Sequence, residues 1–231
     1  MPYLNEPAAA RLNDLIKAHC APEWKQLLRE RNTALTFRKG ETIFSTGEHA
    51  ERMLMIQQGA VKVTAPDGIG GERILRFAGP GEVLGHRSLG HEPVYTATAT
   101  ALSACTVNSI PMGLFLSTLK ANGVFCYHFL LGFAAEMRRL ESHMHDLMTM
   151  DVGQRVAKVL ILDLETYGYD TEDKTKLAFT LSRKDIANAA ATTYESVIRT
   201  LATLQRRRII GLVGKEIRIR NEAALRKIVG G

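Results

Sequence analysis

Two polar residues near the C-terminal end of the chain, Glu195 and Arg199, have the types and spacing needed to read a base sequence. On one helix, a separation of four residues places both side chains on the same face. A carboxylate accepts a hydrogen bond from the amino group of cytosine, and a guanidinium donates two bonds to the edge of guanine. The pair therefore suits a short duplex sequence that contains G·C pairs, although an ordinary surface ion pair has the same spacing.

The charge around this pair favours a polyanionic partner. The 231 residues carry a net charge of +6. Residues 1–150 hold 15 basic and 14 acidic side chains, whereas residues 151–231 hold 15 basic and 10 acidic side chains. Residues 174–227 alone hold 13 basic and four acidic side chains. A segment this basic is a reasonable electrostatic footprint for DNA, although a solvated basic face would give the same composition.

Other functional sites have little support in the sequence. The stretch GPGEVLG lacks the GK[ST] of a phosphate-binding loop, and no Ser-His-Asp set or carboxylate pair stands out, so we do not expect an enzyme. Cys20, Cys105 and Cys126 are too few for an iron–sulfur cluster and too scattered for a disulfide framework, and no metal site is predicted. With 45% hydrophobic residues but no apolar run near the roughly 18 that span a bilayer, we expect a soluble, cytoplasmic protein with no membrane partner.

The reading pair must be held by a compact helical unit. Ser182, with Asp185 three residues later, predicts a capping box at the start of one helix. Thr193 is suited to cap a second helix, whose inner face would consist of Val197, Leu201 and Leu204. Small alanines at positions 187, 189, 190 and 191 allow the two helices to approach closely, which predicts a helix-turn-helix. The apolar residues of 209–219, broken at Gly214, predict a small hairpin beyond it, which makes the unit a winged helix.

The N-terminal half predicts many short strands after a helix over residues 8–31 that is interrupted near Pro22. Glycines separate these β-branched or alternating segments about every ten residues, which favours a barrel or a sandwich. The expected strands are Thr33–Phe37, Glu41–Ser45, Met53–Ile56, Ala60–Thr64, Arg73–Phe77, Tyr95–Thr100 and Cys105–Ile110.

A third segment has the pattern of a dimerisation helix. Six apolar residues alternate in steps of three and four, which is the seam of a two-stranded coiled coil: Leu130, Phe133, Met137, Leu140, Met144 and Leu147. The alternative is a single helix that packs on its own barrel, but such a helix usually buries a broader stripe. Asp151 is a suitable N-cap for the next helix, with Gly153 at an expected hinge.

Three stretches of the sequence, FRKGETIFSTGEHAERMLMIQQGAVKV, GPGEVLGHRSL and LSRKDIANAAATTYESVIRTLATLQRRRII, resemble the Crp/Fnr family of bacterial transcription regulators, and the resemblance covers nearly the whole chain. It implies an α+β protein with an N-terminal helix and a jelly-roll-like double-stranded β-helix over residues 1–111. A dimerisation helix over 112–150 and a winged helix-turn-helix over 151–231 would follow. It implies a homodimer that binds a palindromic operator through residues 194–205, with RNA polymerase as a further partner.

The resemblance also assigns roles to individual residues of the helix-turn-helix. Tyr194, Glu195 and Arg199 match the positions that reach base edges in the major groove. Phosphate contacts that fix the register are expected from Arg183, Lys184, Thr193 and Ser196. Ala191 stands in the turn where glycine is common, so we expect a strained or altered turn there.

The pocket that holds cyclic nucleotides in this family is altered in the present sequence. The matching positions are Gly85, His86, Arg87, Tyr95, Thr96, Leu140 and Glu141. His86 replaces a glutamate that holds the ribose, and Tyr95 with Thr96 replaces the Arg-Ser pair that holds the phosphate. Without that arginine a cyclic phosphate loses its strongest contact, so we expect weak or no cyclic AMP binding.

Several effector hypotheses remain open. The chain is expected to respond to an unidentified small molecule in the β-rich domain, or to none, and no cofactor is predicted. A haem-based gas sensor would take an axial nitrogen from His86, His91 or His128. A cyclic-nucleotide-responsive regulator would need Arg87 to pair with the phosphate. A different class of function is a cyclic-nucleotide-type module that regulates a protein partner, but this leaves the basic winged helix without a role.

Overall fold

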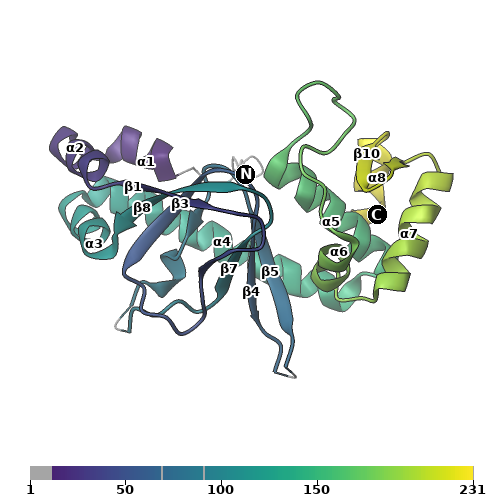
Figure 1. The fold of residues 1–231 in the computed structure, drawn as a ribbon, viewed down its shortest axis with the longest axis horizontal. Coiled ribbons are helices and arrows are strands. Elements are labelled where there is room, and N and C mark those ends of the chain that lie inside the picture. The colour runs from purple at the N-terminus through teal and green to yellow at the C-terminus, as the bar shows by residue number, and fades with distance from the viewer. Residues whose placement is uncertain (1–11, 69, 91, 231) are drawn as a thin grey trace, which may run out of the picture. The chain divides into compact units, whose positions relative to one another are not determined.

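The computed structural model describes residues 12–68, 70–90 and 92–230, whose fold is drawn in Figure 1. The chain forms two compact units. The first comprises Met1–Val61 and Ala78–Ser142, and the second comprises Lys62–Phe77 and His143–Gly231.

The chain starts with two short helices, α1 (Leu12–His19) and α2 (Pro22–Glu30). The predicted interruption near Pro22 is confirmed: the proline begins α2, in the first turn where its missing N–H costs nothing. Residues 8–11 of the expected helix lie outside the described residues.

Among the described residues, strands β1 to β8 form two four-stranded sheets, and this jelly-roll-like arrangement confirms the expected fold class. One sheet has the order β1-β8-β3-β6 and the other has the order β2-β7-β4-β5. In the first sheet β8 pairs antiparallel with both β1 and β3, so that Ser109 lies opposite Thr33 on one side and Leu54 on the other. The strands are β1 (Thr33–Phe37), β2 (Thr42–Phe44), β3 (Arg52–Gln58), β4 (Val61–Pro66), β5 (Glu72–Ala78), β6 (Val83–Leu84), β7 (Thr98–Ala101) and β8 (Cys105–Pro111).

One glycine in this β-structure is required by both its conformation and its surroundings. Gly59 has a φ of +101°, and a Cβ atom at this position would lie 2.5 Å from the carbonyl oxygen of Ala104. Any side chain here would collide with the backbone that leads into β8, so the turn before β4 can only hold glycine.

The segment expected to form one helix over residues 112–150 contains two. They are α3 (Met112–Ala121) and α4 (Gly123–Thr149), and the chain bends by 113° between them. Asn122 occupies the break: its side-chain oxygen accepts a bond from the N–H of Ala21 at 2.8 Å, and its Nδ2 donates to the oxygen of Thr118 at 2.9 Å. The prediction of a single helix over residues 112–150 was wrong. The bond from the N–H of Ala21 that holds Asn122 at the break comes from a residue 101 positions away, which the local sequence does not reveal.

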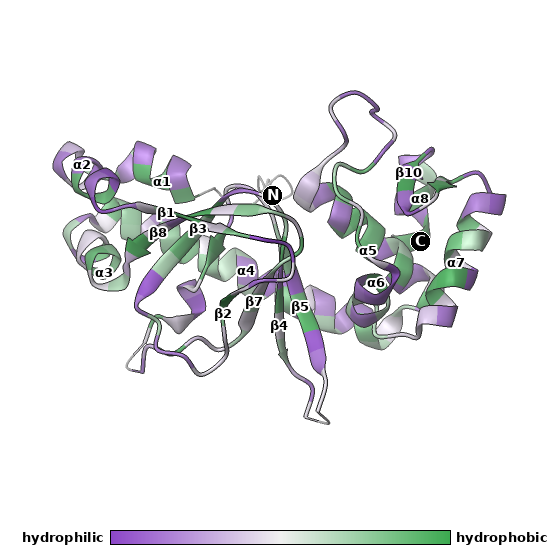
Figure 2. Cartoon of the chain, viewed as in Figure 1, coloured by the Kyte–Doolittle hydropathy of each residue, from purple (hydrophilic) through white to green (hydrophobic). Residues whose placement is uncertain are grey.

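The second unit contains the winged helix-turn-helix that the sequence predicts. Its elements are α5 (Val152–Tyr167), α6 (Arg183–Ala189), α7 (Tyr194–Arg206), β9 (Ile210–Val213), β10 (Glu216–Ile219) and a further helix, α8 (Glu222–Val229). Asp151 caps α5 in a capping box with Gln154, as expected. Gly153 lies inside the first turn of α5. Figure 2 shows that α7 carries both hydrophobic and hydrophilic residues, as an amphipathic helix does.

No single helix among the described residues is long and apolar enough to cross a membrane. The bent pair α3 and α4 meets the length and composition criteria only when the two helices are taken together.

Candidate functional sites

The reading face of α7 is built by a cap and a buried inner side. The side chain of Thr193 accepts a bond from the N–H of Ser196 at 3.2 Å, which fixes where the helix begins. The predicted inner residues are buried, namely Val197, Leu201 and Leu204. The predicted reading residues are exposed on the other side, namely Tyr194, Glu195 and Arg199.

Arg199 is oriented by the helix itself. Its Nη2 donates to the Oγ of Ser196 at 3.1 Å. In the part of the chain that the structure describes, no ion pair joins Glu195 to Arg199. Both groups therefore keep free polar atoms on the exposed face.

The turn of the helix-turn-helix has the strain that its sequence predicts. Ala191 has a φ of +46°, in the left-handed region that favours glycine. The guanidinium of Arg155, on α5, holds this turn: Nε donates to the carbonyl of Ala190 at 2.8 Å, and Nη2 donates to that of Ala191 at 3.4 Å. A third bond from Arg155 reaches the carbonyl of Met150, at the end of α4, at 2.8 Å. Arg155 was not singled out from the sequence, because its partners are backbone atoms.

The four predicted phosphate-contact residues have different environments. Lys184 is exposed, with its charge available to a ligand. Arg183 is half-buried, which lowers the pKa of its guanidinium, and its Nη1 donates to the carbonyl of Lys215 at 2.8 Å. Thr193 and Ser196 bond to each other at the start of α7. Only Lys184 is therefore uncommitted, and Arg183 holds the turn between β9 and β10.

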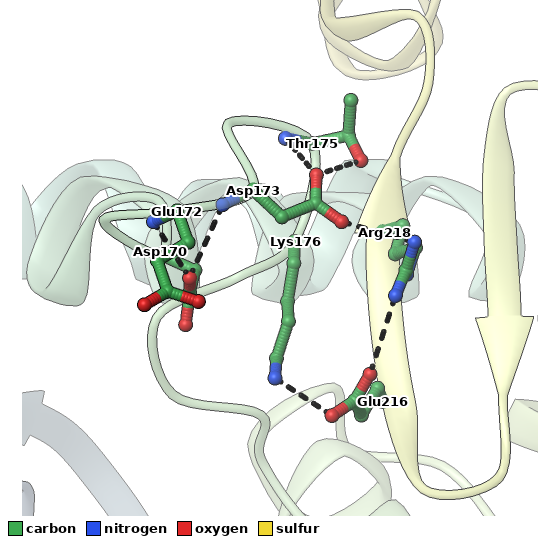
Figure 3. Close-up of polar contacts among 7 residues, drawn as sticks. All are labelled: Asp170, Glu172, Asp173, Thr175, Lys176, Glu216 and Arg218. Carbon is green, nitrogen blue, oxygen red and sulfur yellow. Dashed lines mark hydrogen bonds and ion pairs between the residues drawn. The ribbon is translucent and has the colours of Figure 1, made fainter.

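A network of ion pairs braces this hairpin, as Figure 3 shows. Arg218 on β10 pairs with Asp173 at 2.9 Å, and Glu216 pairs with Lys176 at 2.7 Å. The hydroxyl and N–H of Thr175 also bond to Asp173, and these bonds and the nearby Arg218 lower the pKa of that carboxyl. The loop before α6 and the hairpin are thus held together, so the acidic side chains in this region have a structural role.

The hairpin of β4 and β5, which belongs to the second unit, contacts α6. The amide of Asn188 forms two bonds with the backbone of β5: its oxygen accepts from the N–H of Ile74 at 2.7 Å, and its nitrogen donates to the carbonyl of Glu72 at 2.6 Å. Lys62 pairs with Asp185 at 3.1 Å. Sequence reasoning missed Asn188, whose partners are again backbone atoms more than 100 residues away.

One buried carboxyl lies beneath the helix-turn-helix. Asp163 on α5 is fully buried, and its only hydrogen bond in the described structure is from the N–H of Leu181 at 3.3 Å. Burial raises the pKa of Asp163 to about 8, so the group is largely protonated at neutral pH.

Tyr95 stands at the sequence position where the family resemblance places an arginine, and it is buried. Its ring stacks on that of Phe44, with centroids 3.9 Å apart, and its hydroxyl donates to the carbonyl of Arg52 at 2.9 Å. Gly85 has a φ of +83°, and a Cβ at that position would lie 3.0 Å from the Tyr95 ring. The next predicted pocket residue, Thr96, is exposed. The Tyr95 ring is therefore packed within this unit, against Phe44 and beside Gly85.

Arg87 and His86, two of the residues predicted to line an effector pocket, contact Glu136 on α4. The Nη2 and Nε of Arg87 lie 2.6 and 3.2 Å from one carboxylate oxygen, and the Nε2 of His86 lies 2.6 Å from the other. His86 is buried and packs edge-on against Phe133, and its Nδ1 has no hydrogen-bond partner among the described residues. Leu140 is half-buried and Glu141 is exposed. Glu136 thus places a carboxylate of the same unit against Arg87, the predicted partner of a cyclic phosphate.

The histidines expected for a haem sensor have other contacts. His86 is bound to Glu136, and the ring of His128 stacks on that of His19 with centroids 3.9 Å apart. His91 lies outside the described residues. No group of three or more His, Cys, Asp or Glu side chains suited to a metal ion occurs in the described part of the chain.

The six predicted dimer residues divide between two sides of α4. Leu130, Met137 and Met144 are more than 60% exposed, whereas Phe133, Leu140 and Leu147 are half-buried against their own chain. Tyr127 and Met148 extend the exposed group. With Ala134 and Glu141, these residues follow the alternating steps of three and four of a coiled-coil seam. This set shares Leu130, Met137 and Met144 with the predicted one, and has Ala134, Glu141 and Met148 in place of Phe133, Leu140 and Leu147. We call this set, Tyr127, Leu130, Ala134, Met137, Glu141, Met144 and Met148, the α4 seam.

Comparison with known proteins agrees with both parts of the chain. Residues 34–122 match the family model of the cyclic nucleotide-binding domain, and residues 154–228 match that of the Crp-like helix-turn-helix domain. The CRP-like cAMP-activated global transcriptional regulator of Mycobacterium tuberculosis is 28% identical over 191 residues, which are 82% of this chain and 84% of that protein. The transcriptional regulator LdrP of Thermus thermophilus is 28% identical over 199 residues, which are 84% and 95% of the two chains.

A solved structure supports the same relationship. FixK2 from Bradyrhizobium japonicum is 26% identical, with a TM-score of 0.76 over 85% of this chain and 96% of that chain. The β-rich domain, the long helix and the winged helix-turn-helix follow one another in the expected order, and the relatives are transcriptional regulators rather than enzymes. This chain therefore belongs to the Crp/Fnr family and is a transcription regulator with a helix-turn-helix DNA-binding domain.

Proposed function

We propose that this protein is a homodimer that binds a palindromic operator in duplex DNA and thereby controls transcription by RNA polymerase in the bacterial cytoplasm. The observation that carries the proposal is the exposed face of α7, where Glu195 and Arg199 keep free polar atoms within a strongly basic segment. Glu195 would accept from a cytosine amino group, and Arg199 would donate to guanine O6 and N7. The exposed α4 seam supports a dimer of this kind, since two copies can bury it against each other.

The test of this reading compares two basic residues. We expect Arg199→Ala to flatten the base preference at one position of each half-site and to leave weak nonspecific binding, because a bidentate contact to guanine is worth about 1–3 kcal/mol. Lys184→Ala removes only a phosphate contact, so it should weaken binding to all sequences by a similar factor and reduce the salt dependence. Selection of operators from random duplexes, followed by affinity measurements at several salt concentrations, separates the two effects.

The proposal fails if wild-type protein does not bind random duplex DNA at low salt, or if its affinity does not fall steeply as salt rises. Unchanged sequence preference in Arg199→Ala would leave DNA binding intact and would overturn the role of Arg199.

We also propose that operator binding does not require a cyclic nucleotide. Tyr95 is packed where the phosphate-binding arginine was expected, and Glu136 already neutralises Arg87. A cyclic phosphate would have to displace this carboxylate and would gain no additional cation in return. A haem sensor has less support because His86 and His128 are engaged with Glu136 and His19.

Refolding experiments test the nucleotide independence. Wild-type protein that has been unfolded, dialysed and refolded should bind its operator equally well with and without excess cyclic AMP. If refolded wild-type protein bound its operator only in the presence of cyclic AMP, the proposed nucleotide independence would be wrong.

Glu136→Gln should lower the free energy of unfolding by about 2 kcal/mol, because it weakens charge-assisted bonds to two partners. Glu92→Gln, which changes an exposed carboxylate of the same unit away from α4, is the matched control.

A further inference from the structure

An exposed isoleucine lies on the reading face of α7. In the second unit, and outside α4, the large apolar side chains that the structure shows as exposed are Tyr194, Ile198 and Val213. Ile198 is 42% exposed, although the inner side of the same helix offers fully buried positions such as Val197. Exposure of a single apolar residue is common on protein surfaces, so its position among its neighbours decides what it means.

Ile198 occupies the middle of the reading face. It follows Glu195 by three residues, so the two are neighbours on the helix surface, and Arg199 lies on the far side of Glu195. It also follows Tyr194 by four residues, on the side away from Arg199. Ile198 therefore lies between Tyr194 and Glu195, and a duplex that contacts both of these predicted reading residues also covers it.

The side chain of isoleucine restricts what it can recognise. It has no donor or acceptor, so it cannot pair with the polar edges of bases, and covering an amino or keto group with it would remove water without replacing the hydrogen bond. The apolar group that a base presents in the major groove is the 5-methyl group of thymine. An isoleucine pressed into this groove therefore favours thymine and disfavours the polar edges of the other bases.

We propose that Ile198 is a specificity-determining residue that contacts the 5-methyl group of a thymine beside the bases read by Glu195 and Arg199. This role rests on the proposed DNA-binding function and adds to it an apolar readout. The half-site then contains at least one T·A pair next to its G·C contacts, and Ile198 selects that pair through the methyl group alone.

The experiment replaces thymine by deoxyuridine, which removes the methyl group and keeps every polar edge. Operators selected from random duplexes are substituted one position at a time, symmetrically in both half-sites. For wild-type protein we expect one position where deoxyuridine weakens binding by about fourfold per half-site, the value that corresponds to one buried methyl group. Ile198→Ala should bind the thymine and deoxyuridine operators equally well at that position, and Ile198→Val should retain part of the difference.

A matched control distinguishes this contact from general apolar exposure. Val213→Ala truncates another exposed apolar side chain of the same unit, on β9, and should leave the thymine preference unchanged. Affinity for nonspecific DNA, which should be similar in wild type and Ile198→Ala, reports that the variant is folded. If wild-type binding is insensitive to deoxyuridine at every position, or if Ile198→Ala keeps the sensitivity, the proposal is wrong. Failure to select any operator would instead overturn the proposed DNA-binding function, and the role of Ile198 with it.

Discussion

At the residue scale, the carboxyl of Asp163 links the stability of the second unit to pH. Its pKa is about 8 in the folded protein against 3.8 for an ordinary aspartate, because burial disfavours the charged form. Between these values the unfolded chain releases a proton that the folded chain retains. The free energy of unfolding should therefore fall by up to ~1.4 kcal/mol per pH unit as the pH rises, and this stability contribution is fully present only below about pH 4.

Asp163→Asn tests this linkage. Its amide oxygen can still accept from the N–H of Leu181, but the side chain cannot ionise. We expect urea unfolding at pH 5 and pH 8 to show a much smaller loss of stability in this variant than in wild type. Glu172→Gln, at an exposed carboxylate in the loop before α6, should keep the wild-type pH dependence. Equal slopes for wild type and Asp163→Asn would show that Asp163 does not bind the proton.

At the element scale, α4 is organised by the division of its apolar residues between two sides. Phe133, Leu140 and Leu147 pack partly against their own chain, which leaves the α4 seam for another partner. A second copy of the same helix fits because the seam has the period of a coiled coil. Glu141 would face its counterpart in such a dimer, and a polar residue in a seam costs stability but fixes the register.

Charged residues in the seam should dissociate the dimer. Burying a methionine side chain is worth about 1.5–3 kcal/mol, so Met137→Glu combined with Met144→Glu should raise the dimer dissociation constant by at least ~100-fold. Sedimentation equilibrium measures this directly. Ser142→Glu adds a charge to the same helix on an exposed side away from the seam and should leave the dimer intact. A double variant that still bound a palindrome with full affinity would contradict the dimer scheme.

The elements that the sequence predicts well are those set by nearby residues. Thr193 caps α7, and Leu201 and Leu204 are buried where a period of 3.6 places them. The break at Asn122 and the ion pairs of Glu136 were missed because their partners are distant along the chain. Three of the six residues predicted for the dimer are exposed and three are half-buried, because the spacing alone does not show on which side of α4 the rest of the chain packs.

The dependence on partners that are distant along the chain also limits what the sequence predicts about the helix-turn-helix. Glu195 and Arg199 were predicted from the sequence to lie together on an exposed helical face, and the structure places both on the exposed side of α7. The strain at Ala191 was predicted as well, because glycine is the usual residue of such a turn. Arg155 and Asn188 were not, because they bind carbonyl or N–H groups that every residue offers. An arginine or asparagine with a backbone partner carries no signal of that role in its neighbours.

At the scale of the whole molecule, two copies joined through α4 would present two α7 helices to one duplex. Helix-turn-helix dimers contact half-sites that are about one helical turn apart, roughly 34 Å, on the same side of the DNA. The proposed operator should therefore be a palindrome whose half-site centres are separated by about 10 base pairs.

Changing that separation tests the dimer and its reading helices together. An insertion of about five base pairs turns the second half-site to the opposite side of the duplex, so we expect affinity to fall to that of a single half-site. Scrambling the central bases without changing the length should have a much smaller effect, since it preserves both half-sites and their phasing. Equal affinity for the original and the inserted operators would mean that each DNA-binding domain acts alone, and would remove the role proposed for the α4 seam in DNA recognition.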